Sequence, residues 1–144
     1  MEYQNVLATG VFDLFHVGHL RYLQQARTQG ERLSVAVTPD TMVLAVKGKR
    51  PVIPLEQRME IIHGLGWVDF VGQPLAYYDD ADGAAQWIAD WDINHVVVGG
   101  GWAESPRWAR LTPALAQRGI SVSFALQTEG ISTTLILDAI QRQN

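Results

Sequence analysis

Short apolar runs rich in β-branched residues recur along the chain, separated by longer segments in which apolar residues repeat with a helical period. Such runs predict β-strands. Several of them are apolar at consecutive positions, which is typical of strands buried on both faces of a parallel sheet. The predicted strands are NVLAT (5–9), RLSVAV (32–37), VDFV (68–71), HVVVG (95–99) and ISVSFA (120–125).

The segments between these strands predict helices, because their apolar residues fall at intervals of three and four. Gly30 follows the first of these segments and is predicted to stop its helix. The expected helices are 18–30 with Leu20, Leu23 and Ala26 inward, 54–66 with Leu55, Met59, Ile62 and Leu65 inward, 83–92 with Trp87, Ile88 and Trp91 inward, 105–118, and a short last helix after ISTT.

This alternation predicts an α/β fold. We expect a single-domain, Rossmann-like open parallel sheet of about five strands, with right-handed crossovers that place helices on both faces. The 144 residues suffice for one compact core, and neither a linker nor an internal repeat interrupts 1–144. In such sheets, ligands bind beyond the carboxyl ends of the strands, where the strand order reverses. This rule points to 9–19, 38–50, 99–102 and 126–134.

Composition argues against several classes of function. The net charge of −4 does not favour a nucleic-acid partner, and the lack of cysteine excludes disulfides and thiolate metal sites. No apolar run approaches the roughly 20 residues needed to span a bilayer, and the N-terminus lacks a signal-peptide pattern, so we expect a cytoplasmic protein without a membrane partner. The local exception is the basic run of Lys47, Lys49 and Arg50, a pattern that is often only a solvated loop.

The stretch TGVFDLFHVGHL (9–20) follows the first predicted strand and carries two of the four histidines. Gly10 allows a sharp turn off the strand, and Gly18 allows a ligand to approach the backbone closely. N–H groups at a helix start favour an anion, which His16 and His19 can both face. The spacing fits a zinc site poorly, and neither a dinucleotide fingerprint nor a Walker loop is present.

GVFDLFHVGH resembles the G-x-F-D-x-x-H-x-G-H signature of the cytidylyltransferase-like nucleotidyltransferases, and TEGISTT (128–134) resembles their second hallmark, best known from glycerol-3-phosphate cytidylyltransferase. The resemblance implies an enzyme that transfers CMP or AMP from CTP or ATP to a small phosphorylated alcohol or sugar phosphate and releases pyrophosphate. The catalytic residues that it implies are His16, His19, Lys47 and Thr133. The nucleotide-binding residues that it implies are Gly10, Val11, Phe12, Asp13, Gly18, Lys49, Arg50, Arg58, Gly99, Trp102, Ile131, Ser132 and Thr134.

Some positions depart from the glycerol-phosphate pattern. Gly100 and Gly101 stand where those enzymes have acidic residues, and Gln127 replaces an arginine that precedes TEGISTT. By contrast, RPVIPLEQRMEII and WVDFV look more like heptose-phosphate adenylyltransferases, and somewhat like archaeal-type FAD synthetases. The base therefore stays open between cytosine and adenine. The departures also keep a second class open, a nucleotide-binding regulator with little turnover.

An acceptor phosphate monoester is largely dianionic at pH 7, because its second pKa is about 6, so the implied reaction needs no general base. It needs positioned donors and Mg²⁺ to neutralise developing charge. Asp13 is the nearest acidic candidate for a direct or water-mediated magnesium contact, and it could equally cap the turn.

Tyr77, Tyr78 and Asp79 could contact a hydroxylated acceptor or form plain surface loop. The resemblance also implies a homodimer paired through 66–72.

Overall fold

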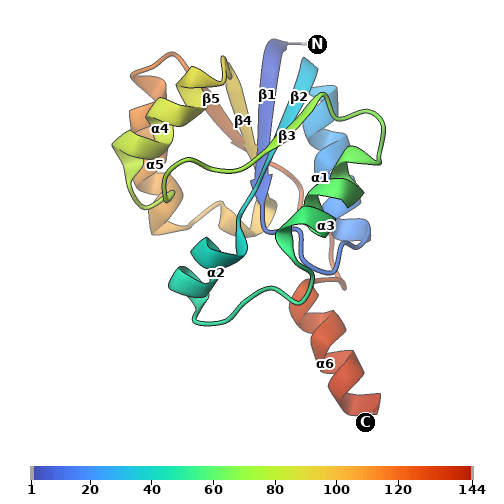
Figure 1. Ribbon diagram of the computed structural model, residues 1–144. Coiled ribbons are helices and arrows are strands. Elements are labelled where there is room, and N and C mark those ends of the chain that lie inside the picture. Colours follow the sequence, from blue (N-terminus) through green and yellow to red (C-terminus); the bar gives the residue numbers. More distant parts are fainter. Residues whose placement is uncertain (1, 144) are drawn as a thin grey trace.

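The computed structural model describes residues 2–143, which form a five-stranded sheet in the order β3-β2-β1-β4-β5 (Figure 1). Every neighbouring pair of strands is parallel. The predicted α/β class with an open parallel sheet is therefore confirmed. The strands are β1 (Tyr3–Gly10), β2 (Gly30–Val37), β3 (Phe70–Gly72), β4 (His95–Val98) and β5 (Ser121–Phe124).

The helices are α1 (Val17–Thr28), α2 (Asp40–Lys47), α3 (Leu55–His63), α4 (Ala81–Asp90), α5 (Pro106–Ala116) and α6 (Thr133–Gln143), with a 3-10 turn η1 (Gly100–Trp102). All the predicted helices are present, although their ends shift and Leu65 lies beyond the end of α3. The prediction missed α2, which is short and buries only Val43, so its apolar stripe is weak. Within residues 2–143, no helix is both long and apolar enough to cross a membrane.

The prediction that Gly30 stops the first helix is wrong. α1 ends at Thr28, with Gln29 as its cap, and Gly30 is the first residue of β2. A Cβ atom at Gly30 would lie 2.6 Å from Val6 Cγ2 and 2.8 Å from the Tyr3 carbonyl oxygen. The glycine is therefore required by the close approach of β2 to β1.

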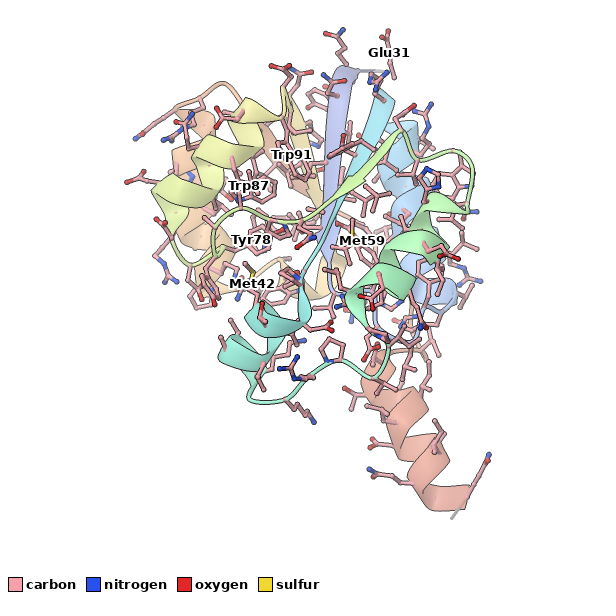
Figure 2. The ribbon with its side chains drawn as sticks, viewed as in Figure 1. Glu31, Met42, Met59, Tyr78, Trp87 and Trp91 are labelled. Carbon is pink, nitrogen blue, oxygen red and sulfur yellow. The ribbon has the colours of Figure 1, made fainter. Side chains whose placement is uncertain are left out.

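Two apolar clusters cover the two faces of the sheet. One includes Leu23 of α1 and Ile62 of α3, and the other includes Trp87 and Ile88 of α4 with Leu111 of α5. Figure 1 shows these two helix pairs on opposite sides of the strands, and Figure 2 shows Trp87 on the side of α4. Burial of these large side chains holds the layers together.

The strand order reverses between β1 and β4, which is where parallel sheets of this kind open a crevice for ligands. Tyr22 of α1 ties the two strand ends together below that crevice. Its hydroxyl donates to the Val97 carbonyl oxygen at 2.5 Å and accepts from the Thr9 N–H at 2.9 Å. The floor of the crevice is thereby fixed to α1.

Arg58 of α3 joins the loops that follow β1 and β2. It is only 1% exposed, and its guanidinium donates to the carbonyl oxygens of Ile53 (2.8 Å), Val11 (2.7 Å) and Thr38 (2.8 Å). It also pairs with the Asp40 carboxylate at the start of α2. Five donors in one planar group allow a single arginine to hold three loop segments.

We expect Arg58→Met to lower the free energy of unfolding by about 3 kcal/mol, the low end for breaking a buried charge pair, because Asp40 stays partly solvated. The carbonyl oxygens that Arg58 contacts would also lose their donor. Chemical denaturation measures the change. Arg21→Met, at an exposed position of α1, is the control and should alter stability little. Equal stability of the two variants would contradict the bridging role.

Candidate active site

A cavity of about 530 Å³ opens at the carboxyl end of the sheet, at the ends of β1 and β4. Its volume lies within the usual range for small-molecule sites, about 300–1,000 Å³. All four segments predicted from the strand ends contribute to its wall. The predicted site residues that line it are Gly10, Val11, Phe12, Asp13, His19, Lys47, Lys49, Arg50, Gly99, Trp102, Thr133 and Thr134.

Five predicted site residues stand outside the cavity wall: His16, Gly18, Arg58, Ile131 and Ser132. The structure does not bring Arg58 to the cavity, because its guanidinium forms hydrogen bonds with backbone carbonyl oxygens and pairs with Asp40. Ser132 caps α6, since its hydroxyl accepts from the Leu135 N–H at 3.0 Å. Arg58 and Ser132 thus hold neighbouring segments in place and do not face the cavity.

His16 and His19 form a stacked pair at the start of α1, with ring centroids 3.8 Å apart. Nδ1 of His16 accepts from the Gly18 N–H at 3.0 Å, and Nδ1 of His19 accepts from the His16 N–H at 3.2 Å. Because each Nδ1 accepts a hydrogen bond, the neutral rings carry their protons on Nε2. The backbone thus fixes the tautomers, and the pair presents two Nε2–H donors.

Gly18 makes this arrangement possible. A Cβ atom at this position would lie 2.8 Å from Cε1 of His16 and 3.4 Å from a methyl group of Ile131. A side chain would therefore displace the first imidazole of the pair. The glycine of the His-x-Gly-His spacing leaves room for the ring that caps the helix, a role beyond the close ligand approach predicted for it.

Both imidazoles favour the neutral form in the free protein. Burial lowers the pKa of His19 to about 4, with a further lowering by His16 and an opposing effect of the Asp13 carboxylate. Burial lowers the pKa of His16 as well. At pH 7 the site therefore offers neutral N–H donors, and an anion bound beside them would raise both pKa values.

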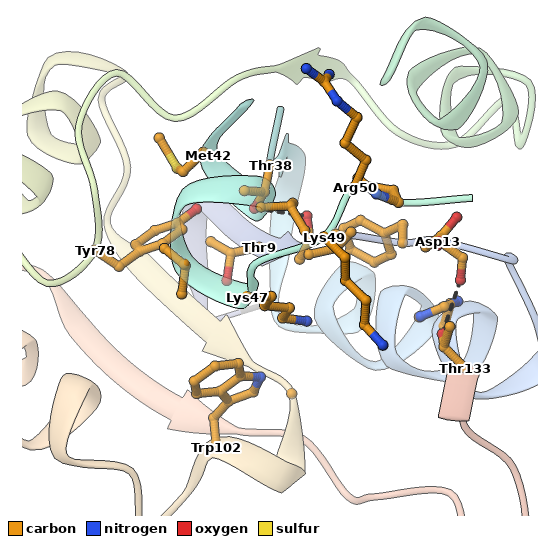
Figure 3. A pocket seen from close by; sticks show the side chains of 18 of the residues that line it. Thr9, Asp13, Thr38, Met42, Lys47, Lys49, Arg50, Tyr78, Trp102 and Thr133 are labelled. Atoms are coloured by element: carbon orange, nitrogen blue, oxygen red, sulfur yellow. Dashed lines mark hydrogen bonds between the residues drawn. The ribbon is translucent and has the colours of Figure 1, made fainter. Parts of the chain in front are cut away.

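Asp13 fastens two neighbouring segments to the end of β1. Its carboxylate accepts from the N–H groups of Val52 (2.8 Å), Ile53 (2.9 Å) and Leu14 (3.1 Å). Its backbone carbonyl accepts from the Thr133 hydroxyl at 3.0 Å, a contact drawn in Figure 3. Of the two roles predicted for Asp13, the structure contains the loop-capping one.

The loop around Asp13 has an unfavourable backbone conformation. Phe12 and Leu14 adopt φ values of 57° and 49°, in the left-handed region that bulky residues avoid. Such residues cost about 1–3 kcal/mol each and persist only where the surroundings hold them. The hydrogen bonds of Asp13 supply that restraint between the two residues.

The residues do not fit a dedicated magnesium site. Within residues 2–143, no group of three or more histidine, aspartate or glutamate side chains could hold a metal ion. Both carboxylate oxygens of Asp13, the predicted ligand, accept backbone hydrogen bonds. Magnesium at nucleotide sites takes most of its ligands from phosphates and water. We therefore assign no residue as a direct metal ligand.

Three cations stand along one side of the cavity. Lys47 is the last residue of α2, and Lys49 and Arg50 follow in the next loop. Gly48, with φ of 77°, ends the helix and turns the chain between the two lysines. In Figure 3, Lys47 and Lys49 extend across the cavity, whereas Arg50 points away from its centre.

Gly100, Gly101 and Gln127 touch one another, so their departures from the glycerol-phosphate pattern form one local change. A Cβ atom at Gly100 would clash with the Ala125 carbonyl oxygen and lie 2.9 Å from the Gln127 nitrogen. A Cβ atom at Gly101 would meet Gln127 Nε2 at 3.6 Å, an ordinary contact. An acidic side chain at Gly100 would therefore require the segment after β5 to move.

On the α4 and α5 side, the sequence reasoning found part of the cavity wall and missed part of it. Tyr77, Tyr78 and Asp79 line the cavity, which favours the first of the two interpretations left open for them. Arg107 and Trp108 line it as well, and the prediction did not name them. They stand in the first turn of a predicted helix, 105–118, for which no site residue was expected.

The family model described as Cytidylyltransferase-like matches residues 7–139. The chain is 39% identical over 139 residues to the Bifunctional protein HldE of Photorhabdus laumondii, covering 96% of this chain and 28% of that protein. It is 37% identical over 139 residues to the protein of the same name from Proteus mirabilis, with the same coverage. The chain thus spans just over a quarter of the length of these curated relatives.

Among solved structures, the chain is similar to the lipopolysaccharide core biosynthesis protein from Thermoplasma volcanium GSS1. The TM-score is 0.67 at 26% sequence identity, and the match covers 87% of this chain and 96% of the other. The five-stranded fold agrees with the prediction, and the matches confirm the prediction of a nucleotidyltransferase. The chain belongs to the cytidylyltransferase-like family.

Proposed function

We propose that this chain transfers AMP from ATP to a sugar phosphate and releases pyrophosphate. The observation that carries the proposal is that His19, with the His16 ring stacked on it at the start of α1, meets Lys47 and Lys49 at one cavity over the strand switch point. This constellation suits a triphosphate, because helix-start N–H groups and cationic side chains both favour phosphate oxygens.

The reaction forms one bond and breaks one. An oxygen of the acceptor phosphate attacks the α-phosphorus of ATP, and the bond from that phosphorus to the oxygen bridging to the β-phosphate breaks. Pyrophosphate leaves with the electron pair of that bond. Because the acceptor oxygen is already deprotonated at pH 7, the chain has to position two anions and neutralise charge rather than remove a proton.

The chain's own residues have distinct tasks in this proposal. His16 and His19 donate Nε2–H bonds to the triphosphate, and Lys47 and Lys49 neutralise charge that grows on the leaving pyrophosphate. Thr133 closes the site from the start of α6. We expect magnesium to arrive with the nucleotide, bound by phosphate oxygens, and we assign it no protein ligand.

AMP is favoured over CMP by the segments RPVIPLEQRMEII and WVDFV, which resemble heptose-phosphate adenylyltransferases. The similar structure from Thermoplasma volcanium is that of a lipopolysaccharide core biosynthesis protein. This likeness supports a sugar phosphate as the acceptor, since such a core is built from sugars. Gly100, which cannot carry an acidic side chain without movement of its neighbours, separates this chain from the glycerol-phosphate pattern.

A homodimer paired through 66–72 remains a prediction. Phe70, on the edge strand β3, is 49% exposed and would lose that exposure in a contact between two copies. Edge strands with apolar side chains are natural places for such pairing.

The central test is pyrophosphate release with ATP, CTP, UTP and GTP, each combined with a heptose phosphate or glycerol 3-phosphate. We expect release with ATP and the heptose phosphate. Release with CTP and glycerol 3-phosphate instead would reverse the choice of base and acceptor. Nucleotide binding without release in any combination would favour the regulator.

We expect His19→Ala to lower turnover by about 100- to 1,000-fold, the usual cost of removing one preorganised donor to a developing anion. The fold should survive, because His19 stands at the cavity rather than in the core. His63→Ala, at an exposed position of α3, is the matched control and should retain wild-type turnover. Wild-type turnover in His19→Ala would remove this residue from the mechanism.

Nucleotide binding should take up protons through His19. With a pKa of about 4 in the free protein, the ring is neutral at pH 6, and adjacent phosphates would raise its pKa. The proton that it gains would enter at Nδ1, in exchange for the hydrogen bond from the His16 N–H. Calorimetric titration of ATP at pH 6, in two buffers of different ionisation enthalpy, measures this uptake. His19→Asn keeps an acceptor for the His16 N–H and should take up fewer protons. Equal uptake by both proteins would show that His19 stays neutral.

A further inference from the structure

The cavity has a second half, which the proposed catalytic residues do not use. His19 and Thr133 line the cavity from α1 and α6, whereas Tyr78 and Arg107 come from the α4 and α5 side. In Figure 3, Tyr78 and Trp102 lie across the cavity from Asp13 and Thr133. A reaction between two anions needs binding groups for each of them, and the triphosphate accounts for only the first half.

The Tyr78 hydroxyl faces the Thr9 side chain but forms no hydrogen bond of normal geometry among the residues that the structure describes. The residue is only 7% exposed, and its ring packs against Trp87 and Trp108 with centroids 6.0 Å away in each case. Its oxygen is buried and unpaired within 2–143, although the side chain lines the cavity. Burial raises the pKa of this hydroxyl, so it is protonated at neutral pH and able to donate. An unpaired buried donor at a cavity wall points to a ligand.

Arg107 is held in place beside this hydroxyl. Its guanidinium lies 4.8 Å from the ring centre of Trp102 and 5.8 Å from that of Tyr78. Its Nε donates to the Asp79 carboxylate at 3.2 Å, which leaves the two Nη groups for a ligand. The side chain is 19% exposed, so the charge is partly desolvated at the cavity wall. Stacking and the ion pair together orient the planar fork before any ligand arrives.

We propose that Tyr78 and Arg107 bind the phosphate of the acceptor. This inference rests on the proposed function, because it supplies the second anion that the transfer requires. An arginine fork binds a phosphate through two parallel N–H donors, and the tyrosine hydroxyl adds a third. The aromatic rings of Tyr78 and Trp102 beside it suit the apolar face of a sugar ring, which makes a sugar phosphate the fitting class of acceptor.

Arg110, one helical turn from Arg107 in α5, provides the matched control. Arg110 also approaches Asp79, at 3.6 Å, but it is 58% exposed and does not line the cavity. Arg107→Met and Arg110→Met thus remove the same charge, next to the same carboxylate, with only one of the two changes facing the cavity. Tyr78→Phe removes the hydroxyl alone and keeps the packed ring.

The experiment is calorimetric titration of a heptose phosphate into protein saturated with a non-hydrolysable ATP analogue. We expect Arg107→Met to weaken binding of the heptose phosphate by about 10- to 100-fold, the usual effect of losing hydrogen bonds to a charged group. Tyr78→Phe should weaken it less and leave the melting temperature equal or higher, since its hydroxyl has no partner to lose within the described part of the chain. Arg110→Met should bind like the wild type.

Two results would overturn the inference. The first is a loss of affinity for the ATP analogue in Arg107→Met with unchanged affinity for the heptose phosphate, which would place the nucleotide in this half of the cavity. The second is that the wild-type protein binds neither a heptose phosphate nor glycerol 3-phosphate. Pyrophosphate release by the wild type tests the proposed transfer separately, so a failure of the transfer and a failure of the acceptor site remain distinguishable.

Discussion

The structure depends on the reversal of the strand order between β1 and β4, because the connections that leave these strands run to opposite faces of the sheet and leave the cavity between them. The Tyr22 hydroxyl fixes the depth of the opening by joining the ends of both strands. Arg58 fixes its rim by joining the loops after β1 and β2. Both side chains donate hydrogen bonds to backbone carbonyl oxygens and do not bind a ligand themselves. They nevertheless determine where the ligand-facing groups lie.

The two faces supply different electrostatics to one cavity. On the α1 side, the paired imidazoles stay neutral in the free protein because burial lowers the pKa of both, and the neighbouring His16 lowers that of His19 further. On the α5 side, the Arg107 guanidinium pairs with the Asp79 carboxylate. One side is thus suited to gain charge as a polyanion binds, and the other presents a fixed charge with a fixed orientation.

Sequence periodicity predicted the sheet and most helices because their apolar stripes are long and buried on one face. It missed α2 because eight residues with one buried side chain leave too short a pattern. The motif residues around His16 and His19 could be placed near a strand end from local sequence, since they follow β1 directly. Arg107 could not be placed in this way, and Tyr78 could only be named as an open candidate, because the two meet only through packing of α5 and the loop after β3 on the same face of the sheet.

The residues on the two sides of the cavity bear on which acceptor it can bind. Gly100 and Gln127 belong to the segments after β4 and β5, whereas Tyr78 and Asp79 precede α4. Changes at the glycines would also reach Arg107, because Trp102, whose ring lies against its guanidinium, belongs to the same 3-10 turn as Gly100 and Gly101. Substitutions in the two sets should therefore be non-additive in their effects on binding. A scaffold of this form can therefore change its acceptor while keeping its phosphate-binding histidines, and the difference resides in residues outside the shared motifs.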